Sequence, residues 1–476
     1  MLSALGSRRP LGGSSRTVST TVRTRERVVA SIDPPTTVVG SQQPLEEVTS
    51  TLPPSTERDR ASGRLRPLPL VCRRCQAQVD AGPIAICEEC LGPLEPRYDP
   101  DRSLPDRRTI AARSPSLWRY REWLPFTGSP GLSLDTGGTP LVEALALAKV
   151  LGVARAWIKN DSVSHPSLSF KDRVVTAAIN AAHAFGIGTI GCASTGNLAN
   201  AVAAHAARAG IPAWIFIPHD LELGKIVATA VCGAHVVRIR GTYDDVNRLC
   251  AQVADAYGWG IVNVNLRSYY GEGSKTVAFE IAEQLGWRTP TAVVAPMAGG
   301  SLVTKLYKGF AEFRSAGLTD ESVPRLYGAQ ATGCAPIVRL LESGGTQLMP
   351  EIPNTVARSI AIGNPADGLL AVEALRKTGG WAAAVSDAEL VRGIRVLAEL
   401  TGIFTETAGG TTVAAAIALA RAGHLKSSDE VVLCVTGNGL KTVEAMAPAL
   451  DEVPVIEPRL RDFEPVRRDR PEPALS

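Results

Sequence analysis

From about residue 135 to residue 450, two kinds of segment alternate along the chain, and this alternation restricts the fold more than any other feature. Short apolar runs rich in β-branched residues are typical of buried parallel strands, and they occupy residues 213–217, 235–239, 291–295 and 431–435. Longer Ala-rich amphipathic stretches, long enough for several helical turns, occupy residues 173–185, 198–209 and 411–422. Such alternation predicts an α/β fold with open, mainly parallel sheets and helices on both faces.

A chain of 476 residues is too long for one ordinary domain of about 100–200 residues, so several packed units are expected. The start of the chain is rich in Ser, Thr, Pro, Arg and Gly, and it can bury too little apolar surface to offset the entropy of ordering. The end of the chain is charged and Pro-rich. The predicted order is a disordered leader at 1–68, a knuckle at 69–96, a linker and approach segment at 97–134, a two-lobed body at 135–458 and a disordered tail at 459–476.

The composition excludes several classes of partner. Hydrophobic residues make up 45% of the chain and charged residues 20%, which is the balance of a soluble globular protein. A formal net charge of +3 is too small to favour binding to nucleic acid or to a membrane surface. There is no uninterrupted apolar run of about 18 residues, so no membrane-spanning helix is predicted.

Four of the nine cysteines form two close pairs, Cys72-x2-Cys75 and Cys87-x2-Cys90, separated by eleven residues. Four thiolates in two such pairs can complete the tetrahedral shell of a structural zinc ion. The alternative is a set of four free thiols. An odd number of cysteines with Cys-x-x-Cys pairs indicates metal binding in a reducing compartment rather than disulfides, so the cytoplasm is the expected location.

A lysine lies where a helix is predicted to begin, in the segment Pro-Ser-Leu-Ser-Phe-Lys-Asp-Arg at residues 166–173. The partial positive charge at a helix N-terminus disfavours an ammonium group, which suits an amine that must attack an aldehyde. Lys171 is therefore a candidate for Schiff-base chemistry with a carbonyl cofactor. The alternative is a surface lysine in a loop that leads into a helix.

Three further segments follow predicted strands, at the edge where an open α/β sheet gathers its ligands. Residues 193–200 carry Ser194, Thr195 and Asn197 at the start of a helix, where donors could hold a carboxylate or a ring hydroxyl. Residues 298–302 form a Gly-Gly loop suited to a phosphate. Thr436 follows the strand at 431–435 and could face a pyridine nitrogen. Taken singly, each segment is equally an ordinary helix cap or turn.

In this order, the four segments resemble the tryptophan-synthase-β-like (fold type II) family of pyridoxal-phosphate-dependent enzymes, over roughly residues 135–450. The resemblance implies two sheets in a two-lobed body, with Lys171 bound covalently to the cofactor and Glu406 near its ring. The cofactor-binding residues that it implies are Lys171, Asn197, Ala298, Gly299, Gly300, Ser301, Leu302 and Thr436. The substrate-binding residues that it implies are Ser194 and Thr195 for a carboxylate, and Arg267, Ser274 and Lys275 for a second phosphate.

Within this family the segments are most similar to those of the threonine synthases, several of which resemble this chain in carrying an N-terminal knuckle. This likeness implies a lyase that converts O-phospho-L-homoserine and water into L-threonine and phosphate. Cysteate synthase and a threonine dehydratase-like lyase on the same fold stay open as alternatives, although the knuckle and residues 267–275 weigh against the dehydratase. A catalytically silent zinc-ribbon binding protein is a further alternative. The oligomeric state is undecided, and a homodimer is compatible with the sequence.

Overall fold

The structure is a computed structural model that describes residues 65–129, 131–194, 196–219, 223–241, 243–319 and 322–469. These residues belong to one compact unit, Glu57–Ser476. Residues 1–64, which make up most of the predicted leader, lie outside the described part, and so does Thr195.

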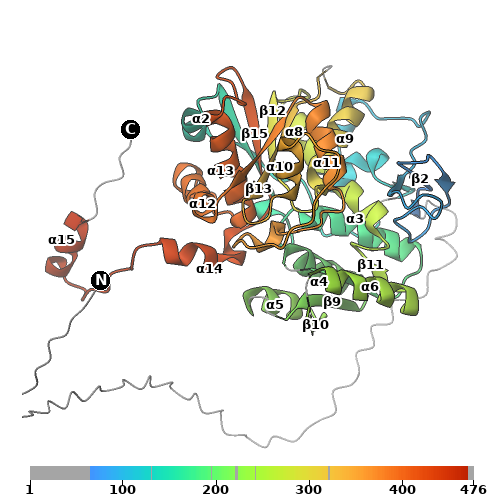
Figure 1. Cartoon of the computed structure of the whole chain (residues 1–476), viewed down its shortest axis with the longest axis horizontal. Helices are drawn as coiled ribbons and strands as arrows, with labels where there is room; N and C mark the ends of the chain where they lie inside the picture. Colours follow the sequence, from blue (N-terminus) through green and yellow to red (C-terminus); the bar gives the residue numbers. More distant parts are fainter. Residues whose placement is uncertain are drawn as a thin grey trace, which may run out of the picture. The chain divides into compact units, whose positions relative to one another are not determined.

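A six-stranded sheet forms the larger lobe (Figure 1), in the order β14-β13-β12-β15-β7-β6. Its strands are β6 (Leu141–Glu143), β7 (Arg155–Asn160), β12 (Ala292–Pro296), β13 (Arg325–Ala331), β14 (Trp381–Val385) and β15 (Glu430–Val435). All neighbours pair in parallel except β6, which runs antiparallel to β7. Parallel strands must be joined by crossover connections, which are usually helices, and these helices cover both faces of the sheet.

Alternate residues of the central strands pack on opposite sides of this sheet. In β12, Val293 and Ala295 contribute to one core cluster, while Ala292 and Val294 contribute to another. The first cluster is formed with α8 (Lys275–Gln284), α9 (Ser301–Ser315), α10 (Pro336–Glu342) and α11 (Gly368–Lys377). The second is formed with α2 (Leu145–Leu151), α12 (Asp387–Thr401) and α13 (Thr407–Arg421). Burial of both strand faces is why these strands are continuously apolar in sequence.

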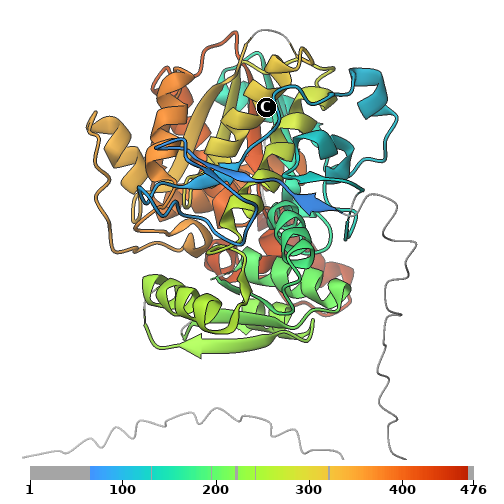
Figure 2. The ribbon, with the colours of Figure 1, turned by 90° about the vertical axis from the view of Figure 1, so that its right-hand side faces the viewer.

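A second, four-stranded parallel sheet has the order β10-β9-β8-β11. Its strands are β8 (Ile190–Ala193), β9 (Ala213–Pro218), β10 (His235–Ile239) and β11 (Gly260–Ile261). The helices of this lobe are α3 (Lys171–Ala184), α4 (Asn197–Ala209), α5 (Leu223–Ala230) and α6 (Tyr243–Tyr257). Figure 2 shows this smaller sheet and its helices, in green, beneath the larger lobe. The predicted fold class, with two mainly parallel sheets and a preceding knuckle, is confirmed.

The knuckle is a three-stranded antiparallel sheet of order β3-β2-β4, with β2 at Leu70–Cys72, β3 at Gln78–Val79 and β4 at Leu94–Pro96. Its buried residues Leu70, Cys87 and Leu94 share a core cluster with helices α3 and α4 of the body. The knuckle therefore packs on the body instead of standing apart from it. Just before the knuckle, β1 (Arg66–Pro67) pairs with β5 (Phe126–Thr127) of the approach segment to form a two-stranded antiparallel sheet.

The predicted linker is packed more firmly than its polar sequence indicated. It contains α1 (Arg107–Ala111) and the 3-10 helix η2 (Leu117–Trp123). Ile110, Tyr120 and Trp123 from these elements are buried in the core of the larger lobe. The reason is that a few large apolar side chains can anchor a segment whose other residues are polar.

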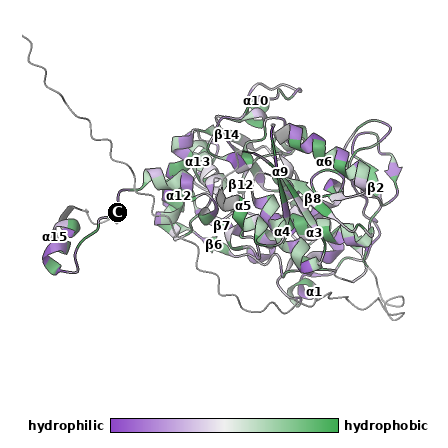
Figure 3. Ribbon diagram, turned by 90° about the horizontal axis from the view of Figure 1, so that it is seen from below, coloured by the Kyte–Doolittle hydropathy of each residue, from purple (hydrophilic) through white to green (hydrophobic). Residues whose placement is uncertain are grey.

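The remaining elements are short. They are α7 (Arg267–Tyr270), α14 (Val443–Met446) and the 3-10 helices η3 (Asp161–Val163), η4 (Gly271–Ser274), η5 (Arg358–Ile360), η6 (Gly439–Lys441) and η7 (Ala447–Ala449). Part of the predicted disordered tail forms a helix, α15 (Leu460–Asp469), and residues 470–476 lie outside the described part. Figure 3 shows hydrophilic and hydrophobic residues alternating along outer helices such as α12 and α6, as expected for helices with one face on a core. Among the described residues, no helix is long and apolar enough to cross a membrane.

Candidate active site

A cavity of about 730 Å³ brings together the segments that the sequence indicated. It is bordered by the ends of β8, β12 and β15, where Ser194, Ala298 and Thr436 line it. It is also lined by Lys171 at the start of α3 and by Glu406, the residue before α13. Carboxyl ends of parallel strands meet at one edge of a sheet, so residues far apart in sequence converge there.

Lys171 is the first residue of α3, and its side chain lines the cavity. Its Nζ donates a hydrogen bond to the hydroxyl of Tyr270 at 3.0 Å and lies 4.7 Å from the centroid of the Phe170 ring. The backbone N–H of Phe170 donates to the carbonyl of Thr436 at 3.0 Å, which ties the helix start to the end of β15. The Lys171 amine is thus positioned at the cavity by its bond to Tyr270 and by the attachment of the helix start to β15.

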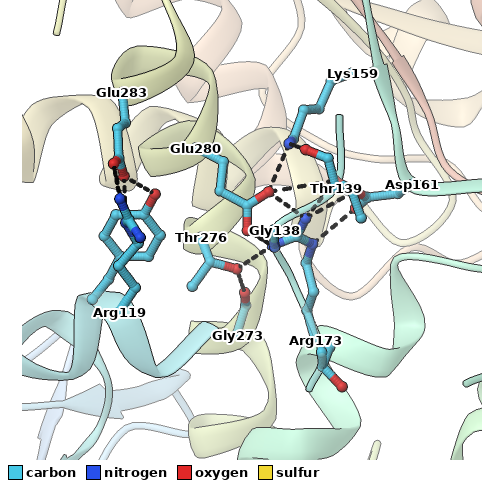
Figure 4. Close-up of polar contacts among 12 residues, drawn as sticks. Arg119, Gly138, Thr139, Lys159, Asp161, Arg173, Gly273, Thr276, Glu280 and Glu283 are labelled. Atoms are coloured by element: carbon cyan, nitrogen blue, oxygen red, sulfur yellow. Dashed lines mark hydrogen bonds and ion pairs between the residues drawn. The ribbon is translucent and has the colours of Figure 1, made fainter. Parts of the chain in front are cut away.

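Two residues after Lys171, the guanidinium of Arg173 lies at the centre of a fully buried ion network (Figure 4). It donates to Asp161 at 2.9 Å and to Glu280 at 2.6 Å. Lys159 donates to Glu280 at 2.6 Å from β7. Burial alone would raise the pKa of Glu280, but Arg173 and Lys159 outweigh it and hold this pKa well below its usual range. The network joins β7, α3 and α8, and it fixes the first turn of the helix that carries Lys171.

Asn197 and Glu406 face each other across the two lobes. The Nδ2 of Asn197 lies 2.8 Å from both carboxylate oxygens of Glu406, and its Oδ1 accepts from Lys441 at 3.1 Å. Gly437 is required beside them, because a Cβ there would lie 2.4 Å from the carboxylate of Glu406. Both buried side chains therefore sit on the cavity, close to where the resemblance places the cofactor ring.

The loop at residues 298–302 connects β12 to α9 and lines the cavity. The residue before α9 is Gly300, with φ of 90°, and a Cβ there would lie 2.7 Å from the carbonyl of Asp367. Glycine has no side chain that could cap the helix, so the N-cap residue makes no side-chain hydrogen bond to the amides of the first turn of α9. Free amides and the helix dipole form a suitable site for a phosphate group.

The residues expected to bind the substrate carboxylate are only partly described. Ser194 lines the cavity, and its Oγ accepts from the amides of Gly196 at 3.1 Å and Ala199 at 3.2 Å. This hydroxyl therefore organises the turn that leads into α4. Thr195 lies outside the described residues.

The structure brings two of the three residues expected at the second phosphate to the cavity. Arg267 and Ser274 line it, and Arg267 pairs with Asp367 at 2.7 Å. Lys275 does not line the cavity: its Nζ is fully buried against Glu272 at 2.7 Å and Glu312 at 2.9 Å. The expectation for Lys275 is corrected on this ground, since an ammonium with two carboxylate partners in the core is not offered to a ligand.

The fit of these residues to pyridoxal phosphate can be judged from the cavity itself. It holds a lysine amine for the aldehyde, a glycine loop at a helix N-terminus for the phosphate, and a hydroxyl at Thr436 for the ring nitrogen. All of these groups lie on the wall of one cavity of a size that can enclose a cofactor and an amino acid. The residues present fit the cofactor.

The four cysteines of the knuckle converge as their spacing predicts. Their sulfur atoms all lie within 4.8 Å of one another, and all nine cysteines of the chain are free thiols. The Sγ of Cys72 accepts from the amides of Arg74 at 3.3 Å and Cys75 at 3.5 Å. Burial raises the pKa of Cys72, but these amides contribute to lowering it to about 6. Four clustered thiols with amide donors suit a tetrahedral zinc ion.

We expect the purified protein to contain one zinc ion per chain. Cys87→Ser removes one buried ligand of the cluster and should lower the bound zinc to well below half an equivalent, measured by elemental analysis after desalting. Cys232→Ser, which changes a thiol outside the cluster, is the matched control and should retain the full equivalent. Equal zinc contents in the two variants would contradict the metal site.

Several cavity residues were not identified from the sequence. Tyr270 contacts the Lys171 amine, and Lys305, from the first turns of α9, lines the cavity where Lys275 was expected to act. Arg73 and Glu95 of the knuckle also line the cavity. No local pattern marks these residues, because their role depends on which segments pack together.

Comparisons with known proteins identify the family of this chain. The family model described as "Pyridoxal-phosphate dependent enzyme" matches residues 132–437. A threonine synthase of Methanosarcina acetivorans is 35% identical over 391 residues, which cover 82% of this chain and 96% of the relative. A threonine synthase of Methanocaldococcus jannaschii is also 35% identical over 391 residues, covering 81% of this chain and 96% of the relative.

Solved structures share the fold at lower identity. An L-serine ammonia-lyase from the fungus Rhizomucor miehei superposes with a TM-score of 0.57 at 22% identity, covering 65% of this chain and 96% of that chain. Maize serine racemase gives a TM-score of 0.55 at 21% identity, covering 65% of this chain and 91% of that chain. By sequence and by fold, the chain belongs to the family of pyridoxal-phosphate-dependent enzymes, and within it to the threonine synthases.

Proposed function

We propose that this protein is a threonine synthase that converts O-phospho-L-homoserine and water into L-threonine and phosphate. The observation that carries the proposal is one cavity in which the amine of Lys171 shares the wall with the 298–302 loop and with the cations Arg267 and Lys305. The loop suits the phosphate of the cofactor, and the two cations suit a second phosphate, that of the substrate. The relatives named threonine synthase support the same reaction.

In this proposal the cofactor is held by three groups of the chain. Lys171 would bind it covalently, the amides of residues 298–302 would bind its phosphate, and Thr436 would interact with its ring nitrogen; all of these residues line the cavity. Asn197, whose Nδ2 lies 2.8 Å from Glu406, would hold the ring hydroxyl. Pyridoxal phosphate, when bound, acidifies the C–H bonds next to the amino group of an amino-acid substrate.

The same cavity orients the substrate. Ser194 and the amides at the start of α4 hold its carboxylate, and Arg267 and Ser274 hold its phosphate with Lys305 as a further cation. Asp367 keeps the guanidinium of Arg267 in place at 2.7 Å. These contacts set the Cα, Cβ and Cγ atoms of the substrate in a fixed order between Lys171 and the phosphate-binding cations.

Lys171 moves the protons. With the substrate bound, the Nζ of Lys171 would take the proton from Cα and then one from Cβ. Tyr270, 3.0 Å from Nζ, fixes the amine in position. Arg267 and Lys305 would stabilise the charge of the phosphate as it leaves Cγ. The two protons held by Lys171 would be returned to Cγ and Cα, and water would add its OH at Cβ to give threonine, its remaining proton replacing one on Lys171.

Product analysis tests this function. Protein loaded with pyridoxal phosphate is incubated in parallel with phosphohomoserine, with phosphoserine plus sulfite, and with threonine. We expect threonine and phosphate in equal amounts from the first mixture, and no turnover in the control treated with borohydride. Cysteate from the second mixture, or a keto acid and ammonia from the third, without threonine from the first, would assign one of the sister activities instead.

The proposed location is the cytoplasm, and the proposed partner is a small-molecule amino-acid substrate, O-phospho-L-homoserine. Nine free thiols, four of them clustered, are compatible with a reducing compartment. A homodimer stays a prediction that size measurement in solution can check.

A further inference from the structure

The knuckle forms one wall of the catalytic cavity. Arg73, Ile86, Leu91 and Glu95, all from the knuckle, line the same cavity as Lys171. A separate zinc ribbon that served only to bind another molecule would not need to close the active site. The position of the knuckle therefore raises the question of what its side chains contribute to ligand binding.

Arg73 is held rigidly at this wall. It lies between Cys72 and Cys75, whose sulfur atoms belong to the four-cysteine cluster. Its own backbone N–H donates to the carbonyl of Pro93 at 3.0 Å. Cys72, directly before Arg73, and Cys75, two residues after it, would be ligands of one metal ion, so the backbone of Arg73 is fixed relative to the cluster.

A short helix docks the knuckle onto the cavity. In α7, the hydroxyl of Ser268 lies 3.0 Å from the carbonyl oxygen of Ile84 and 3.1 Å from that of Leu94, both in the knuckle. The next residue but one, Tyr270, contacts the amine of Lys171. The same four residues of α7 thus join the knuckle to the catalytic lysine and present Arg267 to the cavity.

Most N–H donors of the Arg73 guanidinium are available to bind a ligand. Among the described residues it makes one ion pair, with Glu95 at 3.9 Å, and no hydrogen bond; about 30% of the side chain is exposed. By contrast, Arg267 is paired with Asp367 at 2.7 Å. Arginine presents five N–H donors in a fixed fork that matches phosphate oxygens. Arg73 therefore has a weaker ion pair than Arg267 and more N–H donors available for a phosphate.

The charges around Arg73 favour an anion in the cavity. Glu95 is also bound by Lys308 at 3.0 Å and lies 3.9 Å from Lys305. Burial raises the pKa of Glu95, but these two lysines outweigh burial and lower it, so the carboxylate is charged at neutral pH. Lys305 and Lys308 also pair with Glu272, so Arg73, Lys305 and Lys308 share two carboxylates, Glu95 and Glu272. Three cations against two carboxylates leave positive charge for a ligand, and Lys305, like Arg73, lines the cavity.

We propose that Arg73 of the cysteine knuckle is a specificity-determining residue that binds the phosphate group of the substrate, so that the knuckle is part of the substrate site. The identity of that substrate rests on the proposed function. The knuckle would select for a substrate with a terminal dianion, because a substrate with an uncharged side chain leaves Arg73 with only its ion pair to Glu95.

Arg73→Gln tests the proposal, with Arg74→Gln as the matched control. Arg74 is the adjacent residue and is exposed outside the cavity, where its side chain contacts the carbonyl of Cys90. In protein loaded with pyridoxal phosphate, Arg73→Gln should raise the KM for phosphohomoserine by about tenfold or more while changing kcat less, as expected for a lost charge-assisted bond. Arg74→Gln should keep the KM of the unaltered protein. Zinc and cofactor contents are measured in all variants.

Arg73→Lys keeps the positive charge but not the fork of donors, so it should recover part of the affinity lost in Arg73→Gln. If Arg73→Lys and Arg73→Gln were equally impaired, or if both matched Arg74→Gln, charge at this position would not be what the substrate needs, and the inference would fail. This comparison holds even if one variant folds less well, because it is made at equal zinc and cofactor content.

Binding of inorganic phosphate separates this inference from the proposed function. Calorimetric titration is done on protein loaded with pyridoxal phosphate, so that the loop at 298–302 is already filled. Weaker phosphate binding in Arg73→Gln than in Arg74→Gln supports the site even if no threonine is formed. Threonine formation with unaltered phosphate binding and KM in Arg73→Gln would overturn the inference and leave the proposed function standing.

Discussion

Replacement of Lys171 by alanine is expected to lower the rate of threonine formation by roughly a thousandfold or more, since positioned acid–base groups alone contribute about 10²–10⁴-fold. The variant also loses the amine that binds the cofactor covalently. The absorption band near the edge of the visible range should therefore vanish, and borohydride should no longer fix the cofactor to the chain. Both effects follow from one Nζ that lines the cavity and contacts Tyr270.

The matched control is Lys149→Ala, which removes an exposed lysine from α2. It should retain the absorption band and full activity. Because Lys171 is not part of the buried ion network, its loss should leave the thermal unfolding of the cofactor-free protein nearly unchanged. A Lys171→Ala protein that still carried covalently bound cofactor would show that another amine does this work.

Replacement of Arg173 by alanine is expected to destabilise the fold by about 3–5 kcal/mol, the usual cost of removing one partner from a buried ion network. The variant leaves Asp161 and Glu280 buried with a large part of their compensating charge removed (Figure 4). The measurement is the urea concentration at the midpoint of unfolding. Activity should fall as well, because the network fixes the first turn of α3, which begins with Lys171.

Arg155→Ala is the control for this second result. Its side chain is 45% exposed, pairs with Glu143 at 2.7 Å and with Glu430 at 3.7 Å, and lies 4.7 Å from the centroid of the Trp157 ring. An exposed pair contributes at most about 1 kcal/mol, so the midpoint should move little. Similar shifts in Arg173→Ala and Arg155→Ala would mean that the buried network does not stabilise the fold.

The difference in stability between the unaltered protein and Arg173→Ala should depend on pH with a defined sign. The pKa of Glu280 in the folded protein lies well below its ordinary value of 4.5, because Arg173 and Lys159 outweigh burial. Its stabilising contribution is therefore fully present above pH 4.5 and is lost as the pH falls towards the folded pKa. The free energy of unfolding of the unaltered protein should therefore approach that of Arg173→Ala as the pH falls below 4.5.

The sequence by itself determined the elements and the chemistry that each one carries locally. The strand predicted at 235–239 is β10 with the same bounds, and the helix predicted from residue 173 begins at Lys171. The four cysteines converge as their spacing implied. These features depend on side-chain periodicity, on backbone sterics and on contacts between near neighbours in the chain, all of which are present in a short window of sequence.

Only the tertiary structure decided which side chains reach the cavity. Lys275 and Lys305 both lie at the start of a helix, yet the packing of α8 buries Lys275 among carboxylates while Lys305 lines the cavity. Arg73 reaches the same cavity from a knuckle about a hundred residues before Lys171 in the chain. The direction of a long side chain is set by the segments packed around it, and those contacts join residues whose separation in sequence carries no local pattern.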